Sequence, residues 1–167
     1  MKPTNEEKKI AEQVAKEFNV PYNVLEALIK FESNWNPQAK NPYSYSSARG
    51  LLQWVDITAQ SMGYKNALDL VTQHPTTASQ LRGPVREYFK KYAPYANENE
   101  FIGAVFYPAY RRDMSRVLPD SVQKVNPGIR TMGDYIAGVR SRMGLGPSPL
   151  LILAVAAVAV GVVLSRS

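Results

Sequence analysis

Apolar residues recur at helical spacing along most of this chain, and the sequence therefore predicts a mainly α fold. Thr4, followed three residues later by Glu7, is typical of a helix start, and the helix that follows carries Ile10, Val14 and Phe18 on one face. Patterns typical of strands are weak throughout. Further helices are expected up to about Ser33, from about residue 56, and over residues 77–92, 98–107, 111–117 and 133–143.

The second predicted helix carries a carboxylate on its apolar stripe. Leu25, Leu28, Ile29 and Glu32 follow i, i+3, i+4, i+7 spacing, and Trp35 with an Asn-Pro pair ends the helix just beyond them. Burial raises the pKa of a carboxyl, as a general acid working near neutral pH requires, and Trp35 offers an aromatic wall for a sugar ring. By spacing alone, Glu32 also fits a half-exposed acid near a helix end.

The C-terminal part of the chain has a different composition. Residues 150–164 are an unbroken run of aliphatic, Ala and Gly residues, and the uncharged stretch around them reaches spanning length, with Arg142 and Arg166 as flanking anchors. This pattern predicts a single transmembrane helix that attaches the protein to a lipid membrane; a buried C-terminal core helix is the alternative. The expected organisation is a catalytic domain at 1–143, a Gly/Pro/Ser linker at 144–149 and a membrane anchor at 150–167.

Composition excludes several catalytic classes. The 167 residues contain no Cys and one His, His74, so a cysteine nucleophile is excluded and a hydrolytic zinc site lacks its usual ligands. The setting of His74, "TQHPTT", has no nucleophile-elbow motif for Ser-His-Asp chemistry. We expect no metal and no cofactor. The net charge of +6 favours polyanionic partners, but no nucleic-acid-binding motif accompanies it, so nucleic acid is not an expected partner.

Three short motifs follow one another along the chain: "ESNWNP" at 32–37, "GLLQ" at 50–53 and "FIGAVFYPAY" at 101–110. Together they resemble the signature of the lysozyme-like lytic transglycosylases, a group that includes soluble lytic transglycosylases and goose-type lysozyme. That signature is Glu-Ser followed by Asn-Pro, then Gly-Leu-(Met/Leu)-Gln, then a tyrosine in an apolar helix. Tyr107 matches this tyrosine, in the Tyr-Pro form often found in phage enzymes. The resemblance covers about residues 20–140 and implies a lysozyme-like fold.

The resemblance also implies a reaction. Such enzymes cut the β-1,4 bond between N-acetylmuramic acid and N-acetylglucosamine in peptidoglycan and close a 1,6-anhydro ring. They use one catalytic carboxyl, here Glu32, first as acid and then as base, without a protein nucleophile. The segment after Glu32 contains no acid until Asp56, which favours this scheme over the paired carboxylates of ordinary glycosidases.

The resemblance assigns supporting roles to two further side chains. Gln53 is expected to hydrogen-bond the substrate's N-acetyl group or the region of Glu32, and Tyr107 to donate a hydrogen bond to Glu32. Each has a plain structural alternative, because Gln53 also fits a turn and Tyr107 also fits core packing.

The remaining candidates lie in or beside the segment between the first two motifs. Ser33 is expected to buttress the helix end, and Asn41 stands where many relatives carry a site serine. Gly50 is either part of the site or only a backbone requirement. The insertion "YSYSS" before Ala48 lengthens this loop and is expected to alter how the substrate is bound.

The expected function is a membrane-anchored peptidoglycan lytic transglycosylase. A structural or binding membrane protein that keeps a lysozyme-like domain without turnover is the alternative. The charged N-terminus has no secretory-signal pattern, and with the phage-like Tyr107-Pro108 pair this favours the virion of a membrane-containing phage, for entry or host lysis. A host inner membrane is the second possibility, and the sequence leaves the oligomeric state open.

Overall fold

The computed structural model describes residues 1–43, 45–142 and 144. Helices and their connecting loops make up this part of the chain, where β-structure is limited to isolated bridges such as Lys40 with Arg49. The mainly α prediction is confirmed. The α-helices are α1 (Asn5–Glu17), α2 (Tyr22–Ser33), α3 (Asp56–Ser61), α4 (Ala67–Gln73), α5 (Thr77–Gln80), α6 (Arg86–Tyr92), α7 (Glu98–Phe106), α8 (Asp120–Val125) and α9 (Met132–Ser141).

Helix α1 begins at the predicted Thr4 cap. The Thr4 hydroxyl accepts a hydrogen bond from the Glu7 N–H at 3.2 Å, and the Glu7 carboxylate accepts one from the Thr4 N–H at 2.7 Å. Ile10 and Val14 lie buried on the inner face of this helix, which packs against α2. The local pattern therefore determines both where α1 starts and which face it buries.

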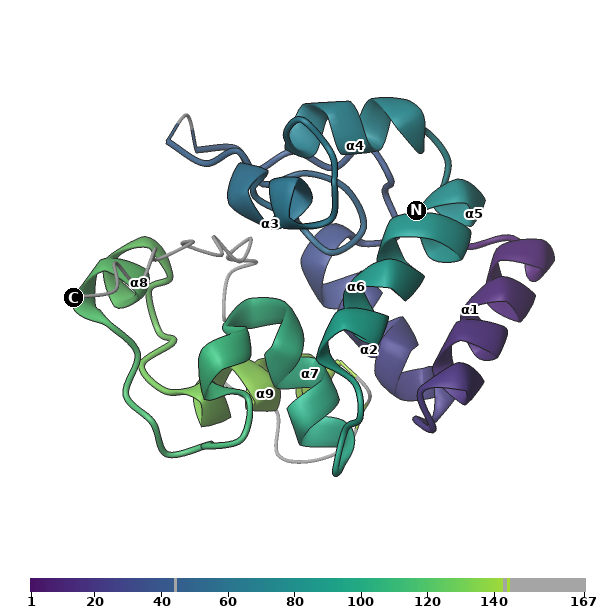
Figure 1. The fold of residues 1–167 in the computed structure, drawn as a ribbon. Helices are drawn as coiled ribbons and strands as arrows, with labels where there is room; N and C mark the ends of the chain where they lie inside the picture. The colour runs from purple at the N-terminus through teal and green to yellow at the C-terminus, as the bar shows by residue number, and fades with distance from the viewer. Residues whose placement is uncertain (44, 143, 145–167) are drawn as a thin grey trace.

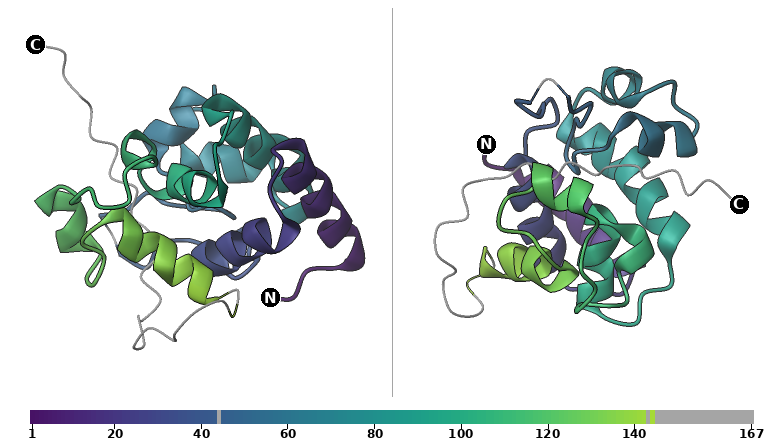
Figure 2. Two further views of the ribbon diagram at one scale, coloured as in Figure 1. Left: turned by 90° about the horizontal axis from the view of Figure 1, so that it is seen from below. Right: turned by 90° about the vertical axis from the view of Figure 1, so that its left-hand side faces the viewer.

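Helix α2 occupies the centre of the fold. It contacts α1, α7 and α9, and most of its side chains are buried, including Leu28, Ile29 and Glu32. Figure 1 shows α3 and α4 grouped on one side of α2, with α7, α8 and α9 on the other. The views in Figure 2 show α9 running beside α2. The C-terminal end of α2 is thus enclosed by segments far from it in sequence.

The helix predicted over residues 77–92 is present as one continuous run. Between α5 and α6, residues Leu81–Val85 form a π-helical turn that contains Pro84. Proline lacks an N–H and clashes with the preceding turn of an α-helix, so the wider π turn accommodates it without ending the helix. Tyr88 and Phe89 on α6 then reach the core.

The helix predicted over 111–117 is wrong. A 3₁₀ turn at Pro108–Tyr110 precedes this stretch, which itself consists of turns and irregular backbone and ends in an isolated bridge from Val117 to Thr131. One oxygen of Asp113 accepts hydrogen bonds from the N–H and hydroxyl of Ser115, at 3.1 and 2.8 Å, and such local bonds compete with helix formation. Helices α4 and α8 were not predicted.

The prediction of a C-terminal transmembrane helix also needs correction. None of the helices in the described part of the chain has the length and the continuous apolar sequence that a bilayer crossing requires. The run at 150–164, on which the prediction rested, lies outside the described residues, as does most of the linker. The fold class of the described residues is mainly α.

Candidate active site

Glu32 sits in the last turn of α2, immediately before an abrupt reversal of the chain. Asn34 ends the helix in the left-handed conformation, with φ of 50°, and its N–H bonds to the Lys30 carbonyl at 3.2 Å. Trp35 follows with φ of 64°, an unusual conformation for so bulky a residue, and such strain costs of the order of 1–3 kcal/mol. Strain of this kind is concentrated at functional sites, and here it directly follows the candidate acid.

A tyrosine from the other end of the sequence holds the carboxyl of Glu32. The Tyr135 hydroxyl donates a hydrogen bond of 2.5 Å to Glu32 Oε1. The Tyr135 ring is fully buried, stacks on Phe106 with centroids 4.4 Å apart and meets Phe31 edge-on at 5.5 Å. Phe31 on α2 and Phe106 on α7 therefore hold the Tyr135 ring in place, and its hydroxyl in turn restricts the orientation of the Glu32 carboxyl.

The environment of Glu32 favours its protonated form. Burial raises the pKa of Glu32 to about 8, against the opposing effects of the Tyr135 hydrogen bond and the positive charge of Arg142. The Arg142 guanidinium lies over the Phe31 ring, 5.1 Å from its centroid. Within the described residues, Glu32 Oε2 has no hydrogen-bond partner. Because Oε1 accepts from Tyr135, the acidic proton belongs on Oε2, where no described protein group holds it.

The second motif forms a tight turn that Gln53 holds closed. The Gln53 side chain is buried, and its Nε2 donates to the Gly50 carbonyl at 3.1 Å and to the Ala39 carbonyl at 3.5 Å. Gln53 and Gly50 both have positive φ, 51° and 78°. In this structure the Gln53 amide binds the protein's own backbone and shapes the loop.

Gln80 on α5 is a positioning residue that the sequence analysis missed. It is fully buried, and its Oε1 accepts from the Leu51 N–H at 2.9 Å. Its Nε2 donates to the Pro37 carbonyl at 2.7 Å and to the His74 carbonyl at 2.9 Å. Gln80 thus ties the segment after Glu32 to the second motif, and the only sequence sign was its place among buried helix positions.

Gly50 is required by the same arrangement. A Cβ at this position would lie 2.9 Å from Gln80 Oε1 and 3.0 Å from the Trp54 ring, closer than side-chain atoms normally approach. Its φ of 78° adds a second reason, since only glycine adopts it without strain.

Three predicted site residues contribute to the backbone framework. Trp35 is only 2 % exposed and lies in the core, so its ring presents no open face in this structure. The Ser33 hydroxyl donates to the Ile29 carbonyl at 3.1 Å, within the last turns of α2. Asn41 is buried, and its Oδ1 accepts from the Tyr43 N–H at 2.9 Å.

The hydrogen bond to Glu32 that the resemblance assigns to Tyr107 is made by Tyr135 instead. Tyr107 ends α7, with its N–H on the Gly103 carbonyl, and its half-buried ring lies 4.7 Å from Tyr110. Pro108 follows and prevents the helix from continuing. Tyr135 stands in the middle of the buried face of α9, and a tyrosine at an apolar helical position was the available sequence sign.

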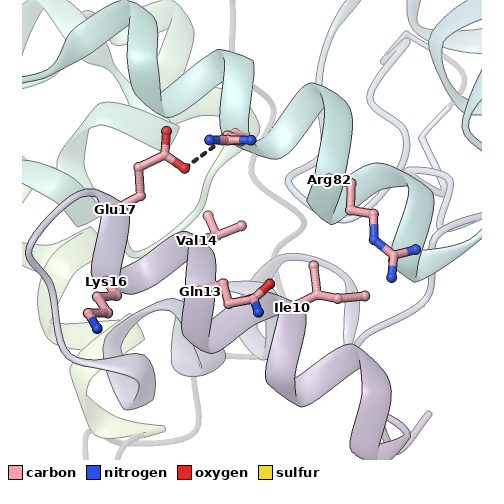
Figure 3. A pocket seen from close by; sticks show the side chains of 7 residues that line it. Ile10, Gln13, Val14, Lys16, Glu17 and Arg82 are labelled. Atoms are coloured by element: carbon pink, nitrogen blue, oxygen red, sulfur yellow. Dashed lines mark ion pairs between the residues drawn. The ribbon is translucent and has the colours of Figure 1, made fainter.

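A separate groove of about 610 Å³ lies between α1 and residues 82–86 (Figure 3). Ile10 and Val14 contribute apolar surface to it, and an ion pair between Glu17 and Arg86 spans it. Its lining contains none of the predicted site residues. Across residues 1–43, 45–142 and 144, no three His, Cys, Asp or Glu side chains are grouped closely enough to ligate a metal ion.

Comparison with known families agrees with the first two motifs. The family model described as "Transglycosylase SLT domain" matches residues 9–86, a range that includes Glu32 and Gln53. Residues 9–86, slightly less than half of the chain, are thus similar to the transglycosylase SLT domain. Tyr135, which holds Glu32, lies outside this SLT match, so its role is inferred from geometry alone.

The curated relatives of this SLT domain are much longer proteins. The membrane-bound lytic murein transglycosylase F 2 of Alkalilimnicola ehrlichii is 38 % identical over 58 residues, 35 % of this chain and 12 % of that protein. The membrane-bound lytic murein transglycosylase F of Vibrio vulnificus is 43 % identical over 58 residues, 35 % of this chain and 10 % of that protein. The matched segment is about a tenth of either relative. No solved structure matches the chain.

Proposed function

We propose that this protein is a peptidoglycan lytic transglycosylase in which Glu32 is the catalytic acid and base. The observation that carries the proposal is the state of Glu32: buried at the end of α2, with a pKa raised to about 8 and an Oε2 that no described group binds. The SLT family match of residues 9–86 and the names of the curated relatives support the same reaction.

The chemistry follows from a single carboxyl. Protonated Glu32 gives its Oε2 proton to the oxygen of the β-1,4 bond, and the bond from that oxygen to C1 of the muramic residue breaks. The resulting carboxylate removes the proton from the C6 hydroxyl of the same residue, and O6 bonds to C1. The products are a shortened glycan and a 1,6-anhydromuramic end, and Glu32 is protonated again.

Tyr135 and Arg142 have a clear task in this cycle. After the first proton transfer the carboxylate is ionised in a buried place, which is unfavourable unless it is compensated. The short hydrogen bond from Tyr135 and the charge of Arg142 both favour the ionised form and lower the pKa of Glu32. Burial keeps Glu32 protonated near neutral pH, and Tyr135 and Arg142 make the loss of its proton less costly.

The surroundings of Glu32 favour this route over hydrolysis by two carboxylates. No described Asp or Glu is among the groups that shift the pKa of Glu32. Asp56, the next acid in sequence, accepts a hydrogen bond from the Ala67 N–H at 3.0 Å. Glu100 is paired with Arg112 at 2.6 Å. A second carboxylate that would activate water has no candidate among these residues, and an intramolecular C6 hydroxyl has a large effective concentration.

The test is the activity of Glu32→Gln on purified peptidoglycan. We expect the variant to fold and to lose lysis, because the amide keeps the shape of the side chain but cannot transfer a proton. Wild-type digests analysed by mass spectrometry should contain 1,6-anhydromuramic ends, lighter by one water than hydrolysis products. Near-wild-type lysis by the variant would refute the role of Glu32, and reducing muramic ends would refute the transglycosylase reaction.

The same experiment separates the second candidate function, a binding protein without turnover. That candidate predicts no lysis by the wild type and unchanged glycan binding by Glu32→Gln. The protonated acid with an unengaged Oε2 favours the enzyme. A role in a phage virion, based on the Tyr107-Pro108 pair, stays a prediction from sequence.

A further inference from the structure

The exposed aromatic surface of this protein is concentrated at two residues that the catalytic scheme does not use. Tyr43 and Tyr45 are 46 % and 61 % exposed, the largest exposed fractions among the described aromatic side chains. Their rings stack on one another, with centroids 5.2 Å apart and planes 9° from parallel. Both tryptophans, in contrast, are 2 % exposed. Trp35, at which the sequence predicts an aromatic wall for a sugar ring, therefore presents no open face, whereas Tyr43 and Tyr45 do.

Described residues on either side of the tyrosine pair form backbone hydrogen bonds with one another. Asn41 donates its N–H to the Ala48 carbonyl at 3.1 Å and accepts the Tyr43 N–H on its side chain at 2.9 Å. The Ser46 N–H bonds to the Tyr43 carbonyl at 3.1 Å. A side chain whose backbone is already fixed loses less entropy when a ligand binds.

The pair also belongs to the segment that links the two catalytic motifs. At the base of this segment Arg49 bridges to Trp54 across the second motif, and the Gly50 N–H bonds to the Ala39 carbonyl at 2.9 Å. Farther along, the Ser47 hydroxyl accepts the Asp56 N–H at 3.0 Å, joining the segment to α3. Tyr43 and Tyr45 are thus connected by short backbone links to the Gly50–Gln53 turn.

We propose that Tyr43 and Tyr45 form a binding site for an N-acetylhexosamine ring of the glycan strand, outside the pair of sugars that reacts. The inference rests on the proposed function, because it takes the glycan strand as the ligand. The faces of aromatic rings are electron-rich and apolar, which suits the C–H face of a pyranose. The residues from Asn41 to Ala48 carry no charge, and the flanking cations Lys40 and Arg49 are bridged to each other at the base of the segment. Aromatic residues that stack on nucleic-acid bases work beside cations, so a single-stranded oligonucleotide is the competing ligand in the test.

Such a site should act on substrate binding and leave the chemical step unchanged. It touches neither Glu32 nor Tyr135 in any described contact, so the energy it supplies is equal in the ground state and the transition state. Loss of uniform binding raises KM and leaves kcat unchanged. This expectation separates the site from residues that position the acid.

The test measures binding in a catalytically inert background. Glu32→Gln protein and the same protein with Tyr43→Ser and Tyr45→Ser are titrated with the N-acetylglucosamine tetramer by calorimetry. Losing both rings should weaken binding about tenfold or more, the scale expected when an aromatic contact is removed. Replacing both tyrosines by Phe should keep the affinity. Ile57→Ser, at a neighbouring position that is 40 % exposed and not aromatic, is the matched control and should have no effect.

Each outcome decides the proposal. Equal affinity with and without the two rings overturns it, as does the absence of any binding by the Glu32→Gln protein. An equal loss with Phe and Ser would also overturn it, because the hydroxyls and not the rings would then bind. Tyrosine-dependent binding of oligothymidine, with none of the sugar tetramer, would identify a nucleic-acid site instead.

Kinetics distinguish this inference from the proposed function. With wild-type Glu32 and soluble glycan strands, Tyr43→Ser with Tyr45→Ser should raise KM at unchanged kcat. A wild type that releases no 1,6-anhydro product but binds the tetramer through the tyrosines would refute the enzyme and keep the site. Full activity with unchanged KM in the double variant would keep the enzyme and refute the site.

Discussion

Replacing Glu32 by Gln should make the folded protein more stable at neutral pH. Burial raises the pKa of Glu32 to about 8, whereas in the unfolded chain it has the ordinary value of 4.5. Between these two values the unfolded state releases the proton and the folded state keeps it, so the wild type loses stability as pH rises. The loss begins near the unfolded pKa and is complete above the folded pKa.

The size of the effect follows from the pKa shift. Each pH unit in this window costs about 1.4 kcal/mol, so at about pH 7 the ionisable side chain lowers the free energy of unfolding by roughly 3 kcal/mol. Gln keeps an oxygen that can accept the Tyr135 hydrogen bond but has no proton to lose. The stability of the Gln variant relative to the wild type should therefore increase by about this amount up to about pH 7, and by roughly 5 kcal/mol over the whole window up to about pH 8.

The measurement is guanidinium unfolding of both proteins at a series of pH values from about 4 to 9. All other ionisable groups are shared by the two proteins, so their pH dependence cancels in the difference between the two unfolding free energies. A part of that difference that does not change with pH reports the cost of the amide N–H of Gln, which has no partner. We expect the difference to be flat at the acidic end, to rise through neutral pH and to level off above about pH 8. Parallel stability curves would mean that Glu32 has an ordinary pKa when folded, and the proposed general acid would lose its physical basis.

Two further substitutions test the surroundings of Glu32. Tyr135→Phe removes a hydrogen bond that favours the carboxylate, so the pKa of Glu32 should rise further. Turnover should fall about ten- to a hundredfold. The basic limb of the pH–rate profile should move to higher pH. Tyr107→Phe is the control, and an equal shift of the limb there would contradict the assignment of the donor. Gln80→Ala removes the side-chain partner of three backbone groups, two in buried hydrogen bonds and one in a partly buried bond, and should lower the free energy of unfolding by about 2–4 kcal/mol in chemical denaturation. Wild-type stability of this variant would show that Gln80 does not hold the two motifs together.

Local periodicity predicted much of the fold. Helices α1, α2, α7 and α9 and the run from Thr77 to Tyr92 lie close to the predicted ranges, because apolar spacing and caps act within a few residues. The helix predicted over 111–117 is absent because other contacts compete with it. Asp113 bonds locally to Ser115, and Arg112 pairs with the buried Glu100. Apolar spacing and helix propensity do not include such contacts.

By itself the sequence determined that Glu32 lies on a buried helical face, that the first two motifs follow in the order of the SLT family match, and that the helix ends directly after Glu32. Only the tertiary structure decided which tyrosine binds Glu32, that Gln80 joins the motifs, and that Trp35 is buried while Tyr43 and Tyr45 are exposed. The contact from Tyr135 to Glu32 joins residues 103 positions apart. Helical spacing specifies which face of a helix is buried, but the partner that meets that face depends on how all the helices pack together.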